Sequence, residues 1–302
     1  MRKIIDEIKS GRILVCDGAW GTELFKRGLK PGNCPELWNI SNPDKVYEIA
    51  ESYVNAGADI IETNSFGGSS ISLARYGLSD RAYELNCVAA QISRKAAGDD
   101  IHVAGSIGPS GKLILMGDIT KEELYESFAG QAKALEDGGA DAAIIETMID
   151  VEESSIAVKA VRENTNLEIM ALATYCRTQS GEFRTMMGAS VNEMVSRAIE
   201  NGAGIIGTNC GSGIDMMVEI VREIQGLFPD MPIIVQPNAG LPEVRNGILI
   251  YPESPEYMAS RIPTLIKAGA NIIGGCCGTS SQHIKLFAKV IGQLQTGMNL
   301  HS

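Results

Sequence analysis

The chain has few aromatic side chains, few histidines and no excess of basic charge. Phe, Trp and Tyr make up 5% of its 302 residues, only three residues are His, and 37 Asp and Glu outnumber 26 Lys and Arg, for a net charge of -11. A nucleic-acid surface needs clustered Lys and Arg to displace counterions from phosphates. The acidic balance therefore argues against nucleic acid as a partner.

Long apolar runs and linker-like segments are also missing. No run approaches the roughly 20 apolar residues of a membrane span, and the opening MRKIIDEIKSGR has charge on both sides of a very short apolar group. No low-complexity segment divides the chain, and α/β barrels of this size often form one domain. We therefore expect a cytoplasmic protein without membrane contact, folded as a single domain over residues 1–302.

Disulfides are not expected either. Seven cysteines are an odd number and are scattered through the chain, which favours metal binding or catalysis over a disulfide framework. Four of them are expected to be ordinary packing residues: Cys16, Cys34, Cys87 and Cys176. The three histidines are poor ligand candidates because one opens a strand, one lies on a late helix and one is in the tail: His102, His283 and His301.

One pattern recurs four times along the chain. In each copy a polar helical run ends at Gly and an Ile-rich run then ends in polar or thiol residues: NAGADIIETN at 55–64, DGGADAAIIET at 137–147, NGAGIIGTNC at 201–210 and KAGANIIGGCC at 267–277. Each copy predicts a helix, a glycine cap, a strand and a loop at the site. Four further apolar runs raise the predicted strands to eight: 13–16, 102–107, 167–175 and 232–236.

Segments with helical periodicity follow the strands: 44–55, 81–97, 121–136, 151–164, 191–200, 215–227, 255–268 and 282–294. Nearly all-apolar strands that alternate with amphipathic helices imply a parallel sheet covered by helices. Eight such units predict an α/β fold, a closed (β/α)8 TIM barrel. An open doubly wound sheet is the alternative, but the first strand leads into CDGAWGTEL rather than GxGxxG, which disfavours a dinucleotide-binding fold.

Three cysteines follow predicted barrel strands, where the chemistry of this fold is placed. Cys210 ends the sixth strand, and Cys276 and Cys277 end the eighth within GGCCGT. Thiolates favour zinc, and three protein ligands leave a fourth position for water or substrate. The flanking glycines let adjacent side chains face one ion. The alternatives are packing of buried cysteines and a vicinal disulfide, which a reducing compartment disfavours.

Several stretches together resemble the homocysteine S-methyltransferase family, and most closely the N-terminal homocysteine-binding module of the cobalamin-dependent methionine synthases. They are GTNC at 207–210, GGCCGT at 274–279, DGAWGTEL at 17–24, IIETNSFGG at 60–68, GSIGPSG at 105–111, IIET at 144–147 and QPNAGLP at 236–242. They span almost the whole chain, so the combined resemblance is specific although no single piece would suffice.

The resemblance implies one zinc ion per chain, held by Cys210, Cys276 and Cys277 with the substrate thiol in the fourth position. A free alkyl thiol with a pKa near 8.5 is only about 3% thiolate at pH 7, and coordination to zinc deprotonates it. The implied reaction is a direct displacement in which sulfur attacks an electrophilic methyl carbon.

The resemblance also implies substrate-binding residues. Glu146 would pair with the ammonium group of homocysteine, Asp17 and Gly18 would hold the amino-acid end, and Asn238 would help to organise the site. Alternatives remain for three of them. Glu146 could pair with a Lys or Arg of the barrel, Asp17 could cap the following helix, and Asn238 could serve a turn.

The methyl donor is inferred from differences between relatives. Betaine-using relatives carry aromatic cage residues at positions that align with Gly67 and Thr147, and S-methylmethionine users carry Arg after the paired cysteines, where this chain has Gly278. We therefore expect a methylated corrinoid on a separate protein, because this chain has no room for cobalamin and folate modules. An aromatic cage rearranged around Trp20 and Trp38, which would bind a quaternary ammonium donor, is the alternative.

The predicted function is thus a cytoplasmic zinc-dependent methyltransferase that forms methionine from homocysteine. Two departures from the family pattern leave another small thiol or a methylated substrate open: ETMID at 146–150, where relatives commonly read ETFSD, and the loop at 176–188 with two arginines. The alternative functions are methyl delivery from a small substrate to a corrinoid protein and a non-catalytic zinc- or thiol-binding barrel in an assembly.

Overall fold

The computed structural model describes residues 3–245 and 248–299, and its centre is a ring of eight parallel strands. Their order is β1-β12-β9-β8-β5-β4-β3-β2, and a parallel bridge between Cys16 and Ile60 joins the first strand to the last. The bounds are β1 Leu14–Val15, β2 Ile60–Glu62, β3 His102–Ile107, β4 Ala142–Met148, β5 Glu168–Ala173, β8 Ile205–Asn209, β9 Ile233–Gln236 and β12 Ile272–Ile273. The predicted (β/α)8 barrel is confirmed, and the open-sheet alternative is wrong.

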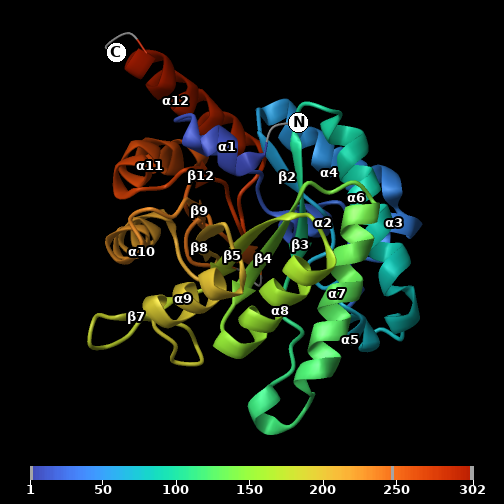
Figure 1. The fold of residues 1–302 in the computed structure, drawn as a ribbon. Helices are drawn as coiled ribbons and strands as arrows, with labels where there is room; N and C mark the ends of the chain where they lie inside the picture. Colours follow the sequence, from blue (N-terminus) through green and yellow to red (C-terminus); the bar gives the residue numbers. More distant parts are fainter. Residues whose placement is uncertain (1–2, 246–247, 300–302) are drawn as a thin grey trace.

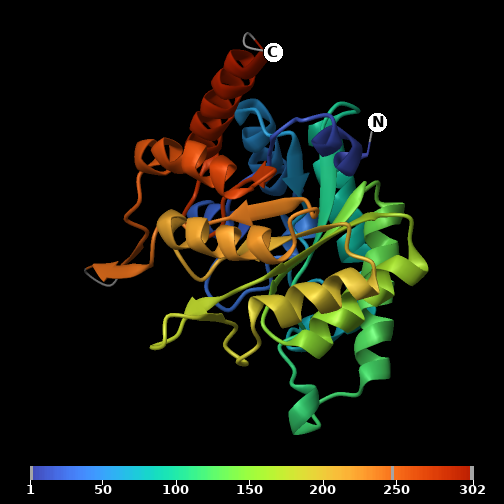
Figure 2. The same ribbon diagram turned by 60° about the vertical axis from the view of Figure 1, so that its left-hand side comes forward.

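Helices surround this ring in both views (Figures 1 and 2). They are α4 Pro43–Ala56, α6 Ala82–Ala97, α7 Lys121–Asp137, α8 Val151–Asn164, α9 Val191–Asn201, α10 Ile214–Leu227, α11 Pro255–Ala268 and α12 Ser281–Asn299. Each corresponds to a predicted periodic segment, and only α12 extends well beyond it. Gly57, Gly202 and Gly269 end α4, α9 and α11 in the left-handed conformation, which glycine adopts without steric cost.

Several short elements were not predicted. The helical ones are α1 Ile4–Lys9, α2 Trp20–Lys26, α3 Trp38–Ser41, α5 Ser70–Ala74, η1 Ser79–Arg81 and η2 Ile114–Met116. Two hairpins pair β6 Cys176–Arg177 with β7 Phe183–Arg184 and β10 Glu243–Arg245 with β11 Ile248–Ile250. Figure 1 shows α1 at one end of the barrel, while β7 lies toward the opposite end, at the carboxyl ends of the strands. We call that second end the mouth.

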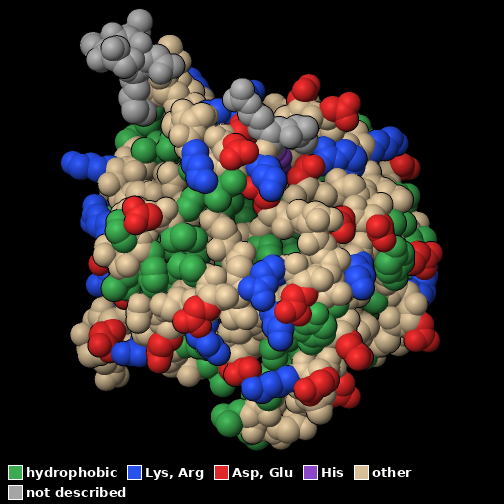
Figure 3. Space-filling model, viewed as in Figure 1, with side chains coloured by type: hydrophobic (Ala, Val, Ile, Leu, Met, Phe, Trp, Pro, Cys, Tyr) green, Lys and Arg blue, Asp and Glu red, His purple; other side chains and the backbone are tan. Residues whose placement is uncertain are grey.

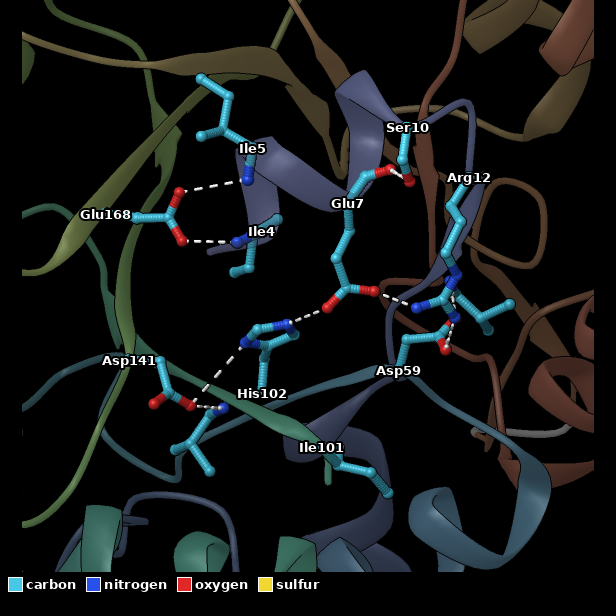
Figure 4. Close-up of polar contacts among 12 residues, drawn as sticks. Ile4, Ile5, Glu7, Ser10, Arg12, Asp59, Ile101, His102, Asp141 and Glu168 are labelled. Carbon is cyan, nitrogen blue, oxygen red and sulfur yellow. Dashed lines mark hydrogen bonds and ion pairs between the residues drawn. The ribbon is translucent and has the colours of Figure 1, made fainter. Parts of the chain in front are cut away.

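Helix α1 closes the amino-terminal end of the barrel. Its Ile4 and Ile8 pack with apolar side chains from all the barrel strands into one interior cluster. Both oxygens of Glu168 accept hydrogen bonds from the first helical amides, at 2.6 Å from Ile4 N and 3.1 Å from Ile5 N. Figure 4 shows these contacts beside the hydrogen bond between Glu7 and His102. His102 is the first residue of β3, as predicted, and its hydrogen bond to Glu7 links β3 to α1 at this closed end.

The outer surface carries charge of both signs. On the face shown in Figure 3, Lys and Arg side chains are interspersed with Asp and Glu rather than gathered into one basic patch. Within the described residues, none of the helices has the length and apolar character required to cross a bilayer.

Candidate metal centre and active site

Three thiols converge at the mouth. Cys210 directly follows β8, and Cys276 and Cys277 lie on the loop after β12; their sulfur atoms are all within 4.8 Å of one another. The sulfurs of Cys210 and Cys277 are 4.0 Å apart. The cysteines are free and only partly exposed. Soft thiolate ligands at this spacing are typical of a metal site that favours zinc.

Backbone hydrogen bonds join the loops that carry these cysteines. Cys210 has a φ of 58°, a left-handed conformation that costs a non-glycine residue roughly 1–2 kcal/mol. Backbone hydrogen bonds join the loops after β8, β9 and β12: Cys210 N to Gln236 O at 3.1 Å, Cys276 N to Pro237 O at 2.8 Å and Ala239 N to Cys277 O at 2.9 Å. Strain of this kind persists where surrounding contacts enforce it, and it is common at functional sites.

The electrostatics of the thiol cluster also suit a cation. Hydrogen bonds from Cys276 and Cys277 lower the pKa of Cys210 to about 3, whereas the hydrogen bond with Cys210 raises the pKa of Cys276 and, to about 11, that of Cys277. The Asn238 side chain also hydrogen-bonds Cys210 and lowers its pKa. Asn238 is buried, and its Oδ1 has no hydrogen-bond partner among the described residues. Asn238 therefore orients Cys210 and keeps one buried oxygen available to a ligand.

A cavity of about 270 Å³ begins at these sulfurs and extends into the barrel. The three cysteines line one part of its wall, and Gly18, Trp20, Glu62, Glu146 and Gln236 line others. The thiols thus share a partly open cavity with buried carboxylates and amides, and Arg75 lines another part of its wall. A small molecule with a sulfur at one end and a cationic group at the other would satisfy both.

Glu146 reaches the cavity from an irregular strand end. The pairing of β4 with β5 shifts register between Ile145 and Met148, and Thr147 has a φ of 60°; such a bulge re-aims a side chain. The sequence pattern predicts that the fourth strand ends at Glu146. Instead β4 runs to Met148, so Glu146 lies inside the strand.

The Glu146 carboxylate has neutral partners. It accepts hydrogen bonds from Ser106 Oγ at 2.5 Å and from Asn209 Nδ2 at 2.8 Å. Burial raises its pKa to about 7. Among the described residues no Lys or Arg forms an ion pair with it. The alternative of a structural ion pair is therefore wrong, and a cationic ligand would find this carboxylate unpaired.

Asp17 lies behind the cavity wall. Its Oδ2 accepts hydrogen bonds from the Trp20 indole at 2.9 Å and from the Glu62 backbone N–H at 2.8 Å, and burial raises its pKa to about 7. Helix α2 begins with Ala19 as its N-cap and has no side-chain cap, so the alternative of a helix cap is wrong. Asp17 holds Trp20 and β2 around the cavity, whereas Gly18 lines it directly.

A third buried carboxylate was missed by the sequence reasoning. Glu62 lines the cavity, is 6% exposed and accepts a hydrogen bond from Gln236 Nε2 at 2.6 Å. Burial and the negative charges of Glu146 and Asp17 raise its pKa well above the usual range. The repeat contains the signal, because IIET at 60–63 places Glu62 as IIET at 144–147 places Glu146. The Gln236 Oε1 atom is buried without a partner among the described residues.

The other sulfur and imidazole groups lie outside the thiol cluster. Cys34 and Cys87 are not among its members. Cys176 is exposed on β6, so its prediction as a packing residue is wrong. Cys16 lies in the barrel interior, within 4.8 Å of Asp17 and Glu62 oxygens. His283, on α12 as predicted, hydrogen-bonds Ser280 at 3.1 Å and the Glu253 carbonyl at 3.3 Å. His301 lies outside the described residues.

Gly67 and Gly278, two of the positions used to infer the methyl donor, pack closely against neighbouring side chains. A side chain at Gly67 would meet Glu36 Oε1 at 2.9 Å, and one at Gly278 would meet the Tyr251 ring at 2.2 Å. Trp20 lines the cavity. Trp38 is buried and does not line it; Lys45 lies 5.0 Å from the Trp38 ring centroid. Trp20 and Trp38 therefore do not line a common aromatic cage.

Comparison with known proteins gives matches along almost the entire chain. The family model described as homocysteine S-methyltransferase matches residues 14–291. The methionine synthases of Mycobacterium tuberculosis and Mycobacterium leprae are each 30% identical to this chain, over 306 and 308 aligned positions and 96% of its length. The chain spans 25% of the length of each of these relatives.

Solved structures share the fold. The metallated homocysteine methyltransferase MmuM from Escherichia coli superposes with a TM-score of 0.76 at 23% identity, covering 94% of this chain and 98% of that one. A methyltransferase from Methanosarcina mazei gives a TM-score of 0.60 at 11% identity, with 94% of each chain covered. From the family match over residues 14–291, this chain belongs to the homocysteine S-methyltransferase family.

Proposed function

We propose that this protein transfers a methyl group to the thiol of homocysteine, with one zinc ion bound by Cys210, Cys276 and Cys277. One observation carries the proposal: the three sulfurs line the same 270 Å³ cavity as buried carboxylates that have no cationic partner among the described residues. Homocysteine carries a thiol at one end and an ammonium group at the other. It therefore matches both parts of the cavity in chemical type.

The carboxylates bind and orient the amino-acid end. Glu146 and Glu62 line the cavity directly, and Asp17 stands behind them. An ammonium group between Glu146 and Glu62 would offset the repulsion that raises the pKa of Glu62. Gly18 lines the cavity wall, and its lack of a side chain lets the segment pack against Thr279 and Tyr53; its backbone would face the substrate carboxylate. Holding both ends of the substrate converts the transfer into a reaction between prepositioned groups.

The sulfur end is activated at the thiol cluster. A bound zinc ion supplies the positive charge that deprotonates the substrate thiol and keeps it as a thiolate near neutral pH. Asn238 orients Cys210 through its hydrogen bond to that sulfur. In the transfer, the substrate sulfur forms a bond to the methyl carbon while the bond from carbon to the donor breaks. The donor retains that electron pair, and methionine is the product.

For the donor we propose a methylated corrinoid on a separate protein that docks over the mouth. Support comes from large apolar side chains exposed on loops after β2, β3, β5 and β9, all at that end: Phe66 42%, Leu115 86%, Met116 71%, Met186 81%, Leu241 57% and Val244 74%. Exposed apolar groups of this size often mark protein-binding surfaces. The cytoplasmic location remains a prediction.

A methyl-transfer assay tests this function. The zinc-loaded protein is mixed with homocysteine and one of four donors: methylcobalamin, a methyl-corrinoid protein, betaine or S-methylmethionine. We expect methionine to form fastest from the corrinoid donors. Faster transfer from betaine or S-methylmethionine would overturn the donor assignment only. No methionine from any donor, together with methylation of free corrinoid by a small methylated compound, would support the reverse transfer instead.

A further inference from the structure

One cationic side chain lines the otherwise acidic cavity. Three thiols and three carboxylates lie along its wall, and the carboxylates belong to Glu36, Glu62 and Glu146. Among the described residues, Arg75 is the one Lys or Arg that lines this cavity. Homocysteine carries a carboxylate as well as an ammonium group. Because like charges repel, this carboxylate needs a positive charge nearby to bind among so many acidic groups.

The backbone of Arg75 is fixed by α5. Arg75 directly follows this helix, which lies toward the mouth in Figure 1. Ser69 caps α5 by accepting a hydrogen bond from Ser72 N at 3.1 Å, and Leu73 is fully buried. The guanidinium carbon of Arg75 lies 4.8 Å from the ring centroid of Tyr76, and arginine stacks favourably on aromatic rings. The ring therefore limits the directions in which the Arg75 side chain can extend.

The Arg75 guanidinium forms no ion pair with a carboxylate among the described residues. Glu36 is the acidic residue that approaches the same glycine: a Cβ at Gly67 would lie 2.9 Å from Glu36 Oε1 and 3.5 Å from Arg75 Nη2. Glu36 is buried, and its two oxygens already accept hydrogen bonds from Gly67 N at 2.7 Å and from Cys34 Sγ at 3.2 Å. Glu36 is thus held in the cavity wall, and the guanidinium can bind a ligand.

The burial of the charged groups matches the two charges of an amino acid. Glu62 and Glu146 are only 6% and 7% exposed, whereas Arg75 is exposed. Gly18 follows β1 and Arg75 follows the loop after β2, and these two strands are neighbours in the ring. An amino acid whose ammonium group lies between the two buried glutamates can therefore direct its carboxylate outward, toward Gly18 and Arg75.

We propose that Arg75 determines substrate specificity by pairing with the substrate carboxylate, so that the site takes an amino-acid thiol rather than a simple aminothiol. This inference rests on the proposed function, because it takes a thiol with an ammonium group as the substrate. A guanidinium presents paired N–H groups that match the two oxygens of a carboxylate. Since Arg75 is exposed, we expect the pair to raise affinity by about fivefold, near the upper limit for an exposed ion pair.

The test varies both the protein and the ligand, with the full zinc-loaded chain at low ionic strength. Arg75→Gln removes the positive charge, and Arg75→Lys keeps it. Arg81→Gln is the matched control, because Arg81 is exposed, pairs with Glu84 and does not line the cavity. Each protein is titrated calorimetrically with methionine and with 3-(methylthio)propylamine, which keeps the thioether and the ammonium group but has no carboxylate.

We expect Arg75→Gln to bind methionine about fivefold more weakly and the amine with equal or higher affinity, because the amine has no carboxylate to lose a partner. Arg75→Lys should retain most of the affinity for methionine, and Arg81→Gln should match the original protein with both ligands. Added salt should reduce the difference between Arg75→Gln and the original protein. Unfolding midpoints check that all the variants are folded.

Two results would overturn the inference alone: unchanged methionine affinity in Arg75→Gln, or equal losses for methionine and the amine. If the unsubstituted protein bound neither homocysteine nor methionine, the proposed function would fail and this inference would fail with it.

Discussion

The two ends of the barrel differ in whether their charged side chains form ion pairs. At the amino-terminal end, Glu7 bonds His102 at 2.8 Å and pairs with Arg12, which also reaches Asp59 at 2.8 Å (Figure 4). Glu168 caps α1 there. At the mouth, the cavity-lining Glu62 and Glu146 and the three clustered thiols form no ion pair with Lys or Arg among the described residues, although Glu23 on α2 pairs with Lys26 and Arg27. The charged groups at the amino-terminal end thus pair with one another, whereas Glu62, Glu146 and the thiols at the mouth can pair with a ligand.

This difference indicates where the fold accepts a cost in stability. Burying an unpaired charge is expensive, and both non-glycine residues with positive φ in the described chain, Thr147 and Cys210, also lie at the mouth. Perturbed pKa values and backbone strain together are typical of a functional site. Among the described residues, no non-glycine residue at the amino-terminal end has a positive φ. That end of the barrel is closed by α1.

The largest expected effect is loss of a proposed metal ligand. Cys277→Ser should lower zinc affinity by more than the 10–100-fold that loss of an outer hydrogen-bonding partner typically costs, because a hydroxyl does not replace a soft thiolate. Metal analysis after dialysis and the methyl-transfer assay measure this. Cys176→Ser is the matched control, since Cys176 is exposed and outside the cluster. Full zinc occupancy in Cys277→Ser would remove that residue from the site.

A smaller effect is expected at the substrate carboxylates. Glu146→Gln should weaken homocysteine binding by roughly 1.5–3 kcal/mol, the usual contribution of a hydrogen bond to a charged group, while zinc stays bound. Calorimetric titration measures the affinity. Glu7→Gln makes the same chemical change at the closed end and should leave binding unaltered. Equal losses in the two variants would contradict the division between the ends.

The pH dependence of binding separates the carboxylates from the thiols. Burial raises the pKa of Glu146 and of Asp17 to about 7, so each carboxyl is neutral below that pH and ionised above it. An ammonium ligand should therefore bind more tightly as pH rises through about 7, with up to about a tenfold change per pH unit for one group. Methionine is the probe because it has no thiol to titrate. A flat profile from pH 6 to 8 would argue against ammonium pairing.

The smallest effect on function is expected at the closed end. Glu168→Ala removes the acceptor for two amides of α1, and loss of a helix cap costs about 0.5–2 kcal/mol. The unfolding midpoint should fall by a few degrees, about 2–4 °C for a 1 kcal/mol change in a large domain. Zinc content should not change. Loss of zinc in this variant would show that the two ends are coupled.

The sequence predicted those parts of the site that depend on local pattern. The repeated helix, glycine and Ile-rich strand placed Cys210 and the Cys276–Cys277 pair at the mouth, because parallel barrel strands end on the same side. The same repeat contains Glu62, and the stretch IIETNSFGG at 60–68 resembles the family, yet no role was predicted for this residue.

Other parts of the site depend on contacts that no local pattern encodes. The Tyr251 ring packs against Gly278, 27 residues later in the sequence, and Glu253 accepts a hydrogen bond from Ile214, 39 residues earlier. Likewise, helix α1 has only six residues and is held by Glu168, more than 160 positions later. Helices this short are marginal by themselves, so tertiary contacts rather than periodicity determine them.

X-ray absorption at the zinc edge tests the central claim most directly, because it counts the sulfur atoms around the metal. The zinc-loaded protein is measured alone and with saturating homocysteine. We expect three sulfur ligands and one lighter ligand without substrate, and four sulfur ligands with it, since the cysteines supply three and the substrate thiol takes the open position. A sulfur count that stays at three when homocysteine is bound would contradict activation of the substrate thiol at this centre.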